Sequence, residues 1–235
     1  MKFSKLGLNN ELLKAIEKAN YKDPYPIQIE AIPALLDQRD ILGIAPTGSG
    51  KTASYILPIL QLLQEKKENR SRNIPVLVLV PTRELASQVA QVADNFSRFL
   101  KRRVKTVAVF GGVSINPQMM KMNGTDILVA TPGRLLDLLS KNSLSLSEVQ
   151  VLVMDEMDKV LNMGFREEVN QILSELPKKR QNVLFSATMD ETLEGMIESL
   201  LKDPKRISVK PAEVEIDLID QYAYRVSAEK KGPLL

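Results

Sequence analysis

Six short, continuous runs of apolar residues limit what this chain can fold into. They are rich in Val, Leu and Ile and do not alternate with polar residues. Strands buried on both faces of a sheet have this pattern, whereas strands with one face in water alternate. We therefore predict buried strands within residues 40–45, 76–80, 106–110, 126–131, 151–155 and 182–187.

Segments with helical periodicity separate these strands. Residues 190–201 are one example, with Asp190 as a favourable N-cap. Residues 84–100 are another, and their apolar stripe contains Leu85, Val89, Val92, Phe96 and Leu100. Strand and helix alternate six times, which predicts an α/β fold with a parallel sheet covered by helices on both faces. In such sheets, ligands bind beyond the carboxyl ends of the strands.

The composition excludes several classes of protein. The 235 residues contain no cysteine and no histidine, which excludes disulfide scaffolds, thiolate or imidazole zinc sites and His-dependent catalysis. Lys and Arg number 32 against 29 acids, a balance too even to indicate a nucleic-acid ligand by itself. No apolar run approaches the roughly 18 residues of a membrane span, and the N-terminus lacks a signal-peptide core. We expect a soluble, cytoplasmic protein with no membrane partner.

The sequence APTGSGKT, after the first predicted strand, indicates a phosphate-binding loop. Its glycines allow a tight turn whose N–H groups face a phosphate at a helix N-terminus, while the lysine reaches the β- and γ-phosphates. The alternative is an ordinary Gly/Ser loop, which the flanking strand and helix argue against. We expect contacts to ATP from Pro46, Thr47, Gly48, Ser49, Gly50, Lys51 and Thr52.

An acidic turn, Asp155-Glu156-Met157-Asp158, follows the fifth predicted strand. Alone, it would be interpreted as a solvated turn. With a phosphate loop in the same chain, Asp155 is a candidate ligand for phosphate-bound Mg²⁺ together with the Thr52 hydroxyl. Glu156 is a candidate for orienting or deprotonating the attacking water. We therefore list Lys51, Asp155 and Glu156 as catalytic candidates.

These motifs and several others, in a fixed order, resemble those of the DEAD-box RNA helicases, with the bacterial RhlE type as the closest likeness. The resemblance implies a RecA-like three-layer α/β/α sandwich with a mostly parallel central sheet. It covers only the first of the family's two RecA-like domains. We expect N-terminal helices and the Q motif at residues 1–39, the ATP-binding domain at 40–209, and a linker towards the second domain at 210–235.

The segment ANYKDPYPIQ resembles the family's Q motif. The resemblance implies that Gln28 reads the adenine edge, that Tyr21 stacks on the ring and that Phe3 is the upstream aromatic residue. Tyr25 stands where the family usually has threonine, so contacts made by that hydroxyl are not implied.

Three further elements resemble motifs that hold single-stranded RNA by its backbone: PTRELA, Gly-Gly and TPGR. Contacts of this kind are sequence-tolerant and salt-sensitive. In isolation each element could be a plain turn, and the two arginines could be exposed or paired with a nearby acid. The implied RNA contacts are Pro81, Thr82, Arg83, Gly111, Gly112, Thr131, Pro132, Gly133 and Arg134.

The sequence Ser186-Ala187-Thr188 resembles the motif that couples ATP hydrolysis to strand separation by bonding the last acid of the acidic turn. The resemblance thus implies coupling roles for Asp158, Ser186 and Thr188, the last two in the catalytic set as well. Met157 replaces the family's alanine. If that position is crowded, the larger side chain would cost about 1–3 kcal/mol.

The resulting hypothesis is the ATP-binding half of an ATP-dependent RNA helicase, with ATP and Mg²⁺ as cofactors and RNA as partner. Because the family's arginine fingers come from the second domain, this chain alone is expected to hydrolyse ATP negligibly. One alternative is a DNA-directed translocase, which the Q motif and PTRELA argue against. Another is a non-catalytic RNA-binding scaffold with a vestigial loop, favoured only by Met157.

Overall fold

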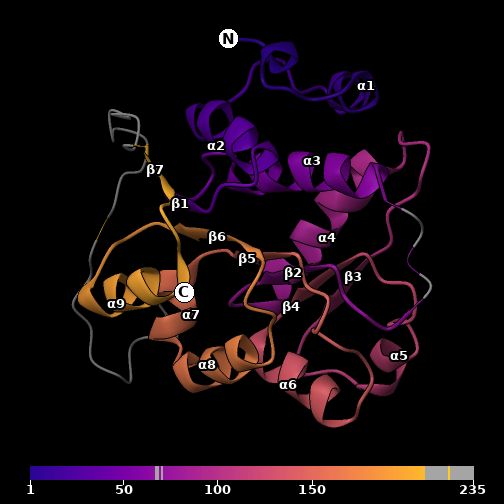
Figure 1. The fold of residues 1–235 in the computed structure, drawn as a ribbon, viewed down its shortest axis with the longest axis vertical. Helices are drawn as coiled ribbons and strands as arrows, with labels where there is room; N and C mark the ends of the chain where they lie inside the picture. Colours follow the sequence, from indigo (N-terminus) through magenta and orange to yellow (C-terminus); the bar gives the residue numbers. More distant parts are fainter. Residues whose placement is uncertain (67–68, 70, 210–221, 223–235) are drawn as a thin grey trace.

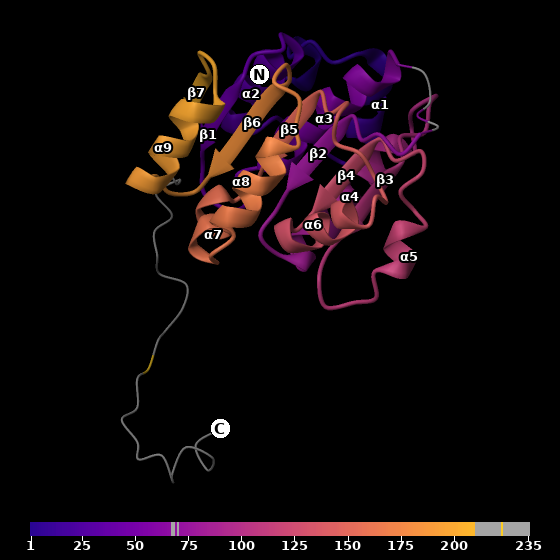
Figure 2. The same cartoon turned by 60° about the horizontal axis from the view of Figure 1, so that its bottom comes forward.

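A computed structural model of the chain describes residues 1–66, 69, 71–209 and 222. Its centre is a seven-stranded sheet in the order β3-β4-β2-β5-β6-β1-β7, and every strand pairing in it is parallel (Figures 1 and 2). The strands are β1 (Ile41–Ile44), β2 (Val76–Leu79), β3 (Thr106–Val109), β4 (Ile127–Ala130), β5 (Val151–Met154), β6 (Gln181–Ser186) and β7 (Lys205–Ser208).

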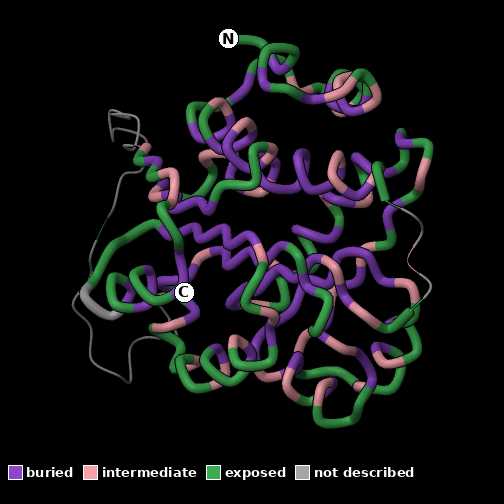
Figure 3. The backbone as a smooth tube through the Cα atoms, in the orientation of Figure 1, coloured by how far each residue is buried: buried purple, intermediate pink, exposed green. Residues whose placement is uncertain are grey.

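Helices cover both faces of the sheet, which confirms the predicted three-layer α/β/α architecture. One apolar cluster lies between the sheet and α1 to α4, and a second lies between the sheet and α6 to α9. In Figure 3 the inner strands of the sheet are buried, while the outer faces of the helices are exposed. The helices are η1 (Phe3–Lys5), α1 (Asn10–Lys18), α2 (Pro26–Leu36), α3 (Lys51–Gln64), α4 (Arg83–Ser97), α5 (Asn116–Met119), α6 (Pro132–Ser140), α7 (Met157–Asn162), α8 (Arg166–Ser174) and α9 (Glu191–Leu200).

All six predicted strands are present, and so are the two helices predicted from periodicity. Asp190 caps α9 as expected, because its carboxylate accepts a 2.8 Å hydrogen bond from Leu193 N. In the described part of the chain, no helix is both long and apolar enough to cross a bilayer.

The seventh strand, β7, was not predicted. Its sequence, KRIS, buries only Ile207, because it is an edge strand paired with β1 alone. Such a strand gives no continuous apolar run, so its signal is weak. The predicted boundaries at residues 39/40 and 209/210 stay a prediction, and the linker expected at 210–235 lies, apart from residue 222, outside the described residues.

Candidate functional site

The two sets of predicted motifs lie at different halves of the carboxyl edge of the sheet. The adjacent strands β5, β6 and β1 lead into the acidic turn, the Ser-Ala-Thr motif and the phosphate loop. The adjacent strands β3, β4 and β2 lead into Gly-Gly, TPGR and PTRELA. Residues expected to bind nucleotide therefore follow neighbouring strands, and so do residues expected to bind RNA.

The phosphate loop joins β1 to α3 through two residues with left-handed backbone. Gly48 has φ +84° and Gly50 has φ +89°, which only glycine adopts at little cost. Lys51 begins α3, and its Nζ donates hydrogen bonds to the carbonyls of Ala45 (2.9 Å) and Pro46 (3.3 Å). The ammonium group thus lies within the curve of the loop, at the N-terminus of a 14-residue helix, where an anion is favoured.

Gln28 connects the N-terminus of α2 to the phosphate loop. Its Nε2 donates to Gly50 O at 3.0 Å, and its Oε1 accepts from Tyr25 N at 3.0 Å. The side chain is 0% exposed, so both amide atoms are used inside the protein. Adenine recognition by Gln28 stays a prediction, and the residue also braces the loop.

The aromatic residues of the Q motif divide between the core and the loop. Phe3 and Tyr21 line a cavity of about 470 Å³ beside α1, and Tyr21 also packs edge-on against Phe96, with ring centroids 5.4 Å apart. Tyr25 is half exposed and lies over the loop, where a Cβ added to Gly50 would come within 2.9 Å of its ring. The family resemblance implied no contact for Tyr25.

Asp155 is a buried carboxylate at the end of β5. It is 2% exposed, and burial raises its pKa to about 6, although a hydrogen bond from Tyr55 and the charge of Lys51 oppose this. The Tyr55 hydroxyl donates to Asp155 Oδ2 at 2.9 Å. Tyr55 was not among the site residues predicted from the sequence. The signal for it was its spacing of three residues from Thr52, which places both on one face of α3.

The oxygen atoms near this point fit a hard divalent cation. Among the described residues, no three His, Cys, Asp or Glu side chains gather into a metal-binding cluster. A magnesium ion is, however, commonly bound through one or two protein oxygens together with substrate phosphates. Thr52 at the start of α3 and the buried carboxylate of Asp155 provide such oxygens beside the phosphate loop.

Glu156 has a strained backbone between β5 and α7. Its φ and ψ are +53° and +47°, a left-handed conformation that costs a non-glycine residue about 1 kcal/mol or more. Its side chain is 13% exposed, and its carboxylate forms a 2.9 Å ion pair with Lys159. The hydrogen bond that Lys159 donates to Glu156 raises the pKa of Lys159.

The last acid of the turn bonds the Ser-Ala-Thr motif as the resemblance implied. Asp158 Oδ2 accepts hydrogen bonds from Thr188 Oγ1 at 2.9 Å and from Thr188 N at 3.1 Å. Ser186 Oγ donates to Thr188 O at 2.7 Å, which holds the motif in shape. Burial alone would raise the pKa of Asp158. The hydrogen bonds that the carboxylate accepts, chiefly from Thr188, outweigh burial and lower the pKa.

At the half of the edge formed by β3, β4 and β2, Thr82 caps α4 by accepting a 3.3 Å hydrogen bond from Leu85 N. Arg83 is exposed and pairs with Glu84 at 2.6 Å. It remains accessible to a phosphate, because an exposed ion pair contributes little free energy and exchanges readily.

Arg134 lies inside the protein instead. It is 8% exposed, and its Nη2 donates to Val113 O at 2.8 Å, next to the Gly-Gly pair. Its Nε lies 3.4 Å from Asp137, too poorly aligned for a hydrogen bond. In this structure Arg134 therefore connects the TPGR turn to the Gly-Gly loop, and its contact with RNA stays a prediction.

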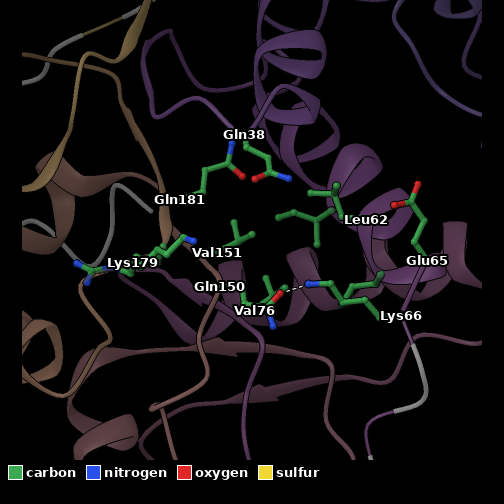
Figure 4. Close-up of a pocket in the computed structure, with 12 residues that line it drawn as sticks. Gln38, Leu62, Glu65, Lys66, Val76, Gln150, Val151, Lys179 and Gln181 are labelled. Carbon is green, nitrogen blue, oxygen red and sulfur yellow. Dashed lines mark hydrogen bonds between the residues drawn. The ribbon is translucent and has the colours of Figure 1, made fainter.

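A separate cavity of about 650 Å³ lies at the opposite, amino-terminal edge of the sheet (Figure 4). It is bordered by Val76, Val151 and Gln181 at the starts of three strands. Lys66 donates to Gln150 across it, and the Gln181 amide bonds two backbone carbonyls. None of the residues lining it belongs to the predicted site, and Lys66, Gln150 and Gln181 already have partners inside the protein.

Comparison with protein families decides between the possible assignments of this arrangement. The family described as DEAD/DEAH box helicase matches residues 25–196, which include the acidic turn, the phosphate loop and most of the sheet. The chain belongs to this family.

Individual relatives support the same assignment. The DEAD-box ATP-dependent RNA helicase CshA of Streptococcus pneumoniae is 41% identical over 98% of this chain and 43% of its own length. The ATP-dependent RNA helicase DeaD of Escherichia coli is 41% identical over 99% of this chain and 36% of its own length. A crystal structure of a DEAD box protein from Methanococcus jannaschii matches with a TM-score of 0.82 and 36% identity, over 89% of this chain and 56% of that one.

These comparisons confirm the RecA-like fold and the DEAD-box resemblance. The chain spans less than half the length of the CshA and DeaD relatives. Because those relatives are named CshA and DeaD, the finer likeness to the RhlE type stays a prediction.

Met157, the departure from the DEAD sequence, is part of the core. It is 0% exposed and belongs to the apolar cluster on the α6 to α9 face, where α7 packs against β6 and α9. The three acids around it keep their separate contacts with Tyr55, Lys159 and Thr188. The fold thus accommodates the large side chain on the side of the turn that faces away from those contacts.

Proposed function

We propose that this chain is the ATP-binding half of an ATP-dependent RNA helicase that couples ATP binding and hydrolysis to local unwinding of short RNA duplexes. One observation carries the proposal: a phosphate loop, a buried carboxylate and a Thr188–Asp158 bond follow three adjacent parallel strands. The relatives named above, which are called ATP-dependent RNA helicases, support it.

Each residue of the nucleotide half has a role in this proposal. The loop amides and Lys51 bind the phosphates, and Thr52 and Asp155 hold Mg²⁺. The ion, when bound, neutralises charge on the β- and γ-phosphate oxygens. Glu156 orients the attacking water and accepts its proton. Its exchangeable ion pair with Lys159 keeps the carboxylate near the turn without burying it fully.

RNA binds at the other half of the edge, through hydroxyl, guanidinium and backbone N–H groups of PTRELA, Gly-Gly and TPGR. Thr82 and Thr131 lie at the N-termini of α4 and α6, where phosphate oxygens are favoured. Such contacts ignore base sequence, so affinity for single-stranded RNA should fall steeply with added salt.

A second RecA-like domain of the same protein is the remaining partner, and it supplies the arginine fingers. Since such fingers contribute about 10³–10⁵ in rate, the 235-residue chain alone should hydrolyse ATP negligibly and unwind nothing. Substantial RNA-stimulated turnover by the purified chain would contradict this. A cytoplasmic location stays a prediction.

The test is titration of the chain with fluorescent ADP and ATP analogues in Mg²⁺, beside Lys51→Ala and Gln28→Ala variants. We expect micromolar to millimolar affinity that Lys51→Ala abolishes. Adenine and guanine nucleotides should be compared in Gln28→Ala. Selective loss of adenine affinity indicates base reading, whereas equal loss for both bases indicates that Gln28 acts by bracing Gly50.

Two alternatives predict other outcomes. A non-catalytic RNA-binding scaffold would bind single-stranded RNA but no nucleotide, and it would leave the Lys51→Ala variant indistinguishable from the wild type. A DNA-directed translocase would prefer single-stranded DNA to RNA of the same length and sequence. Absence of any nucleotide binding by the wild-type chain would overturn the proposed function.

A further inference from the structure

The Tyr55 hydroxyl is a buried polar group that none of the recognised motifs explains. Tyr55 is 0% exposed, and its hydroxyl donates a 2.9 Å hydrogen bond to Asp155 Oδ2 from a helix 100 residues away in sequence. A phenylalanine could fill the same space without burying a hydroxyl, which is unfavourable unless the group is paired. The hydroxyl therefore acts on the carboxylate, and packing alone does not account for it.

The Tyr55 ring has little freedom to move. It packs against Phe185 on β6, with ring centroids 5.8 Å apart. Phe185 in turn lies over Gly43 of the neighbouring strand β1, where an added Cβ would come within 2.3 Å of its ring. The phenol is thus held between helix and sheet, and its oxygen has a fixed position relative to the end of β5.

Asp155 is held at both carboxylate oxygens. Tyr55 binds Oδ2, and the backbone N–H of Glu156 donates to Oδ1 at 3.0 Å. The Glu156 bond comes from the adjacent residue, so Tyr55 is the contact that fixes the carboxylate relative to α3. Thr52 precedes Tyr55 by three residues and lies on the same face of α3. Tyr55 therefore links the Asp155 carboxylate to the helix that carries Thr52.

We infer that Tyr55 is a positioning residue, whose hydroxyl holds Asp155 in a fixed position relative to α3 so that Asp155 and Thr52 receive nucleotide-bound Mg²⁺ together. This inference rests on the proposed function, since it concerns the same site. Partners of metal ligands typically contribute 10- to 100-fold to metal affinity. Because Glu156 N still holds one oxygen, we expect the lower end for Tyr55.

The test is the affinity of fluorescent ADP for the wild type and for Tyr55→Phe, each measured in Mg²⁺ and in EDTA. The ratio of the ADP affinity in Mg²⁺ to that in EDTA, which we call the Mg²⁺ enhancement, isolates the contribution of the ion. No catalytic turnover is required. We expect Tyr55→Phe to bind ADP in EDTA as the wild type does, and its Mg²⁺ enhancement to fall about 10-fold, or about 1.4 kcal/mol. An unchanged or larger enhancement would overturn the inference.

A matched control separates positioning from general loss of a buried hydroxyl. Ser97 is 2% exposed and bonds Val104 through its hydroxyl, far along the chain from the phosphate loop and acidic turn. Ser97→Ala should lower the unfolding temperature but leave the Mg²⁺ enhancement unchanged. If Ser97→Ala reduces the enhancement as much as Tyr55→Phe does, the effect is global and the inference fails.

A double-mutant cycle keeps the inference testable if Tyr55→Phe is unstable. Asp155→Asn removes the buried charge that the phenol partners, so the double variant tolerates phenylalanine better. We expect Asp155→Asn to lose most of the Mg²⁺ enhancement, and Tyr55→Phe to reduce it no further in that background. An additional, additive loss would overturn the inference, whereas failure of the wild type to bind ADP at all would overturn the proposed function and the inference with it.

Discussion

Replacing Met157 with alanine would restore the family's DEAD sequence, and we expect it to destabilise the fold without harming the nucleotide site. Met157 is 0% exposed in the apolar cluster on the α6 to α9 face. The neighbouring acids point to other partners, Asp155 to Tyr55 and Asp158 to Thr188. The substitution therefore removes core volume and leaves those contacts in place.

The magnitude follows from burial and from the cavity left behind. Truncating a buried methionine to alanine costs about 2–5 kcal/mol. The surrounding cluster contains Met154 and Met196, whose flexible side chains can partly fill the space, so we expect about 2–3 kcal/mol. For a protein of this length, 1 kcal/mol shifts Tm by about 2–4 °C, which gives a decrease of about 4–12 °C.

The assay is urea unfolding of the wild type, Met157→Ala and two controls, followed by Mg²⁺–ADP titration. Met163 lies at the end of the same helix and is 52% exposed, so Met163→Ala should change stability by less than about 0.5 kcal/mol. Met157→Leu nearly conserves volume and should cost less than about 1.5 kcal/mol. Equal stability of Met157→Ala and the wild type would show that the Met157 side chain contributes nothing to the apolar core. Lost ADP affinity in a stable Met157→Ala variant would show that the side chain acts on the site.

Three other perturbations have expected outcomes. Burial raises the pKa of Asp155 from 3.8 to about 6, so its charge opposes folding above pH 6, and this penalty disappears as the pH falls towards 4. Asp155→Asn should therefore stabilise the nucleotide-free chain by up to about 3 kcal/mol at pH 8 and hardly at all at pH 4. Urea unfolding at the two pH values measures the difference. Gly50→Ala should lower Tm more than Gly48→Ala, because both have positive φ but only a Cβ at Gly50 meets Gln28, at 2.6 Å. Asp190→Ala should cost about 0.5–2 kcal/mol in unfolding free energy, because α9 loses its N-cap, with Asp190→Asn as the conservative control.

The parts of the structure that the sequence predicted are those with a local signal. Buried strands and the cap at Asp190 each follow from a few adjacent residues, and the structure contains them. The phosphate loop was recognised because its glycines must adopt positive φ, as Gly48 and Gly50 do. Placement of the motifs beyond the strand ends followed from the parallel sheet alone.

The parts that were missed depend on contacts between distant segments. Tyr55 and Asp155 are 100 residues apart, so no short pattern connects them. The burial of Arg134 depends on Val113, in a loop from another strand, and TPGR by itself gives no sign of it. β7 is held by backbone bonds, from Lys205 N to Asp40 O and from Val209 N to Ile44 O, which any sequence could make.

The hydrogen-bond ladder of the sheet continues past the strand ends into the functional loops. Ala45 N donates to Ser186 O at 3.0 Å, which ties the phosphate loop to the Ser-Ala-Thr motif. Asp155 N donates to Leu79 O at 3.0 Å, which ties the acidic turn to the strand before PTRELA. Loops joined in this way hold their positions because moving one would break backbone bonds inside the protein.

Between β5 and β6, beyond the strand ends, the acidic turn and the Ser-Ala-Thr motif are joined by side chains, through Asp158 and Thr188. A side-chain hydrogen bond can break and reform with a rotamer change. This costs less free energy than breaking the backbone hydrogen bonds of the ladder. The contact between Asp158 and Thr188 connects the turn that contains Asp155 to β6. The end of β6 in turn bonds the phosphate loop. In the proposed helicase, a change in charge at the nucleotide would therefore reach the rest of the edge through Asp158 and Thr188, with the strained backbone of Glu156 beside them.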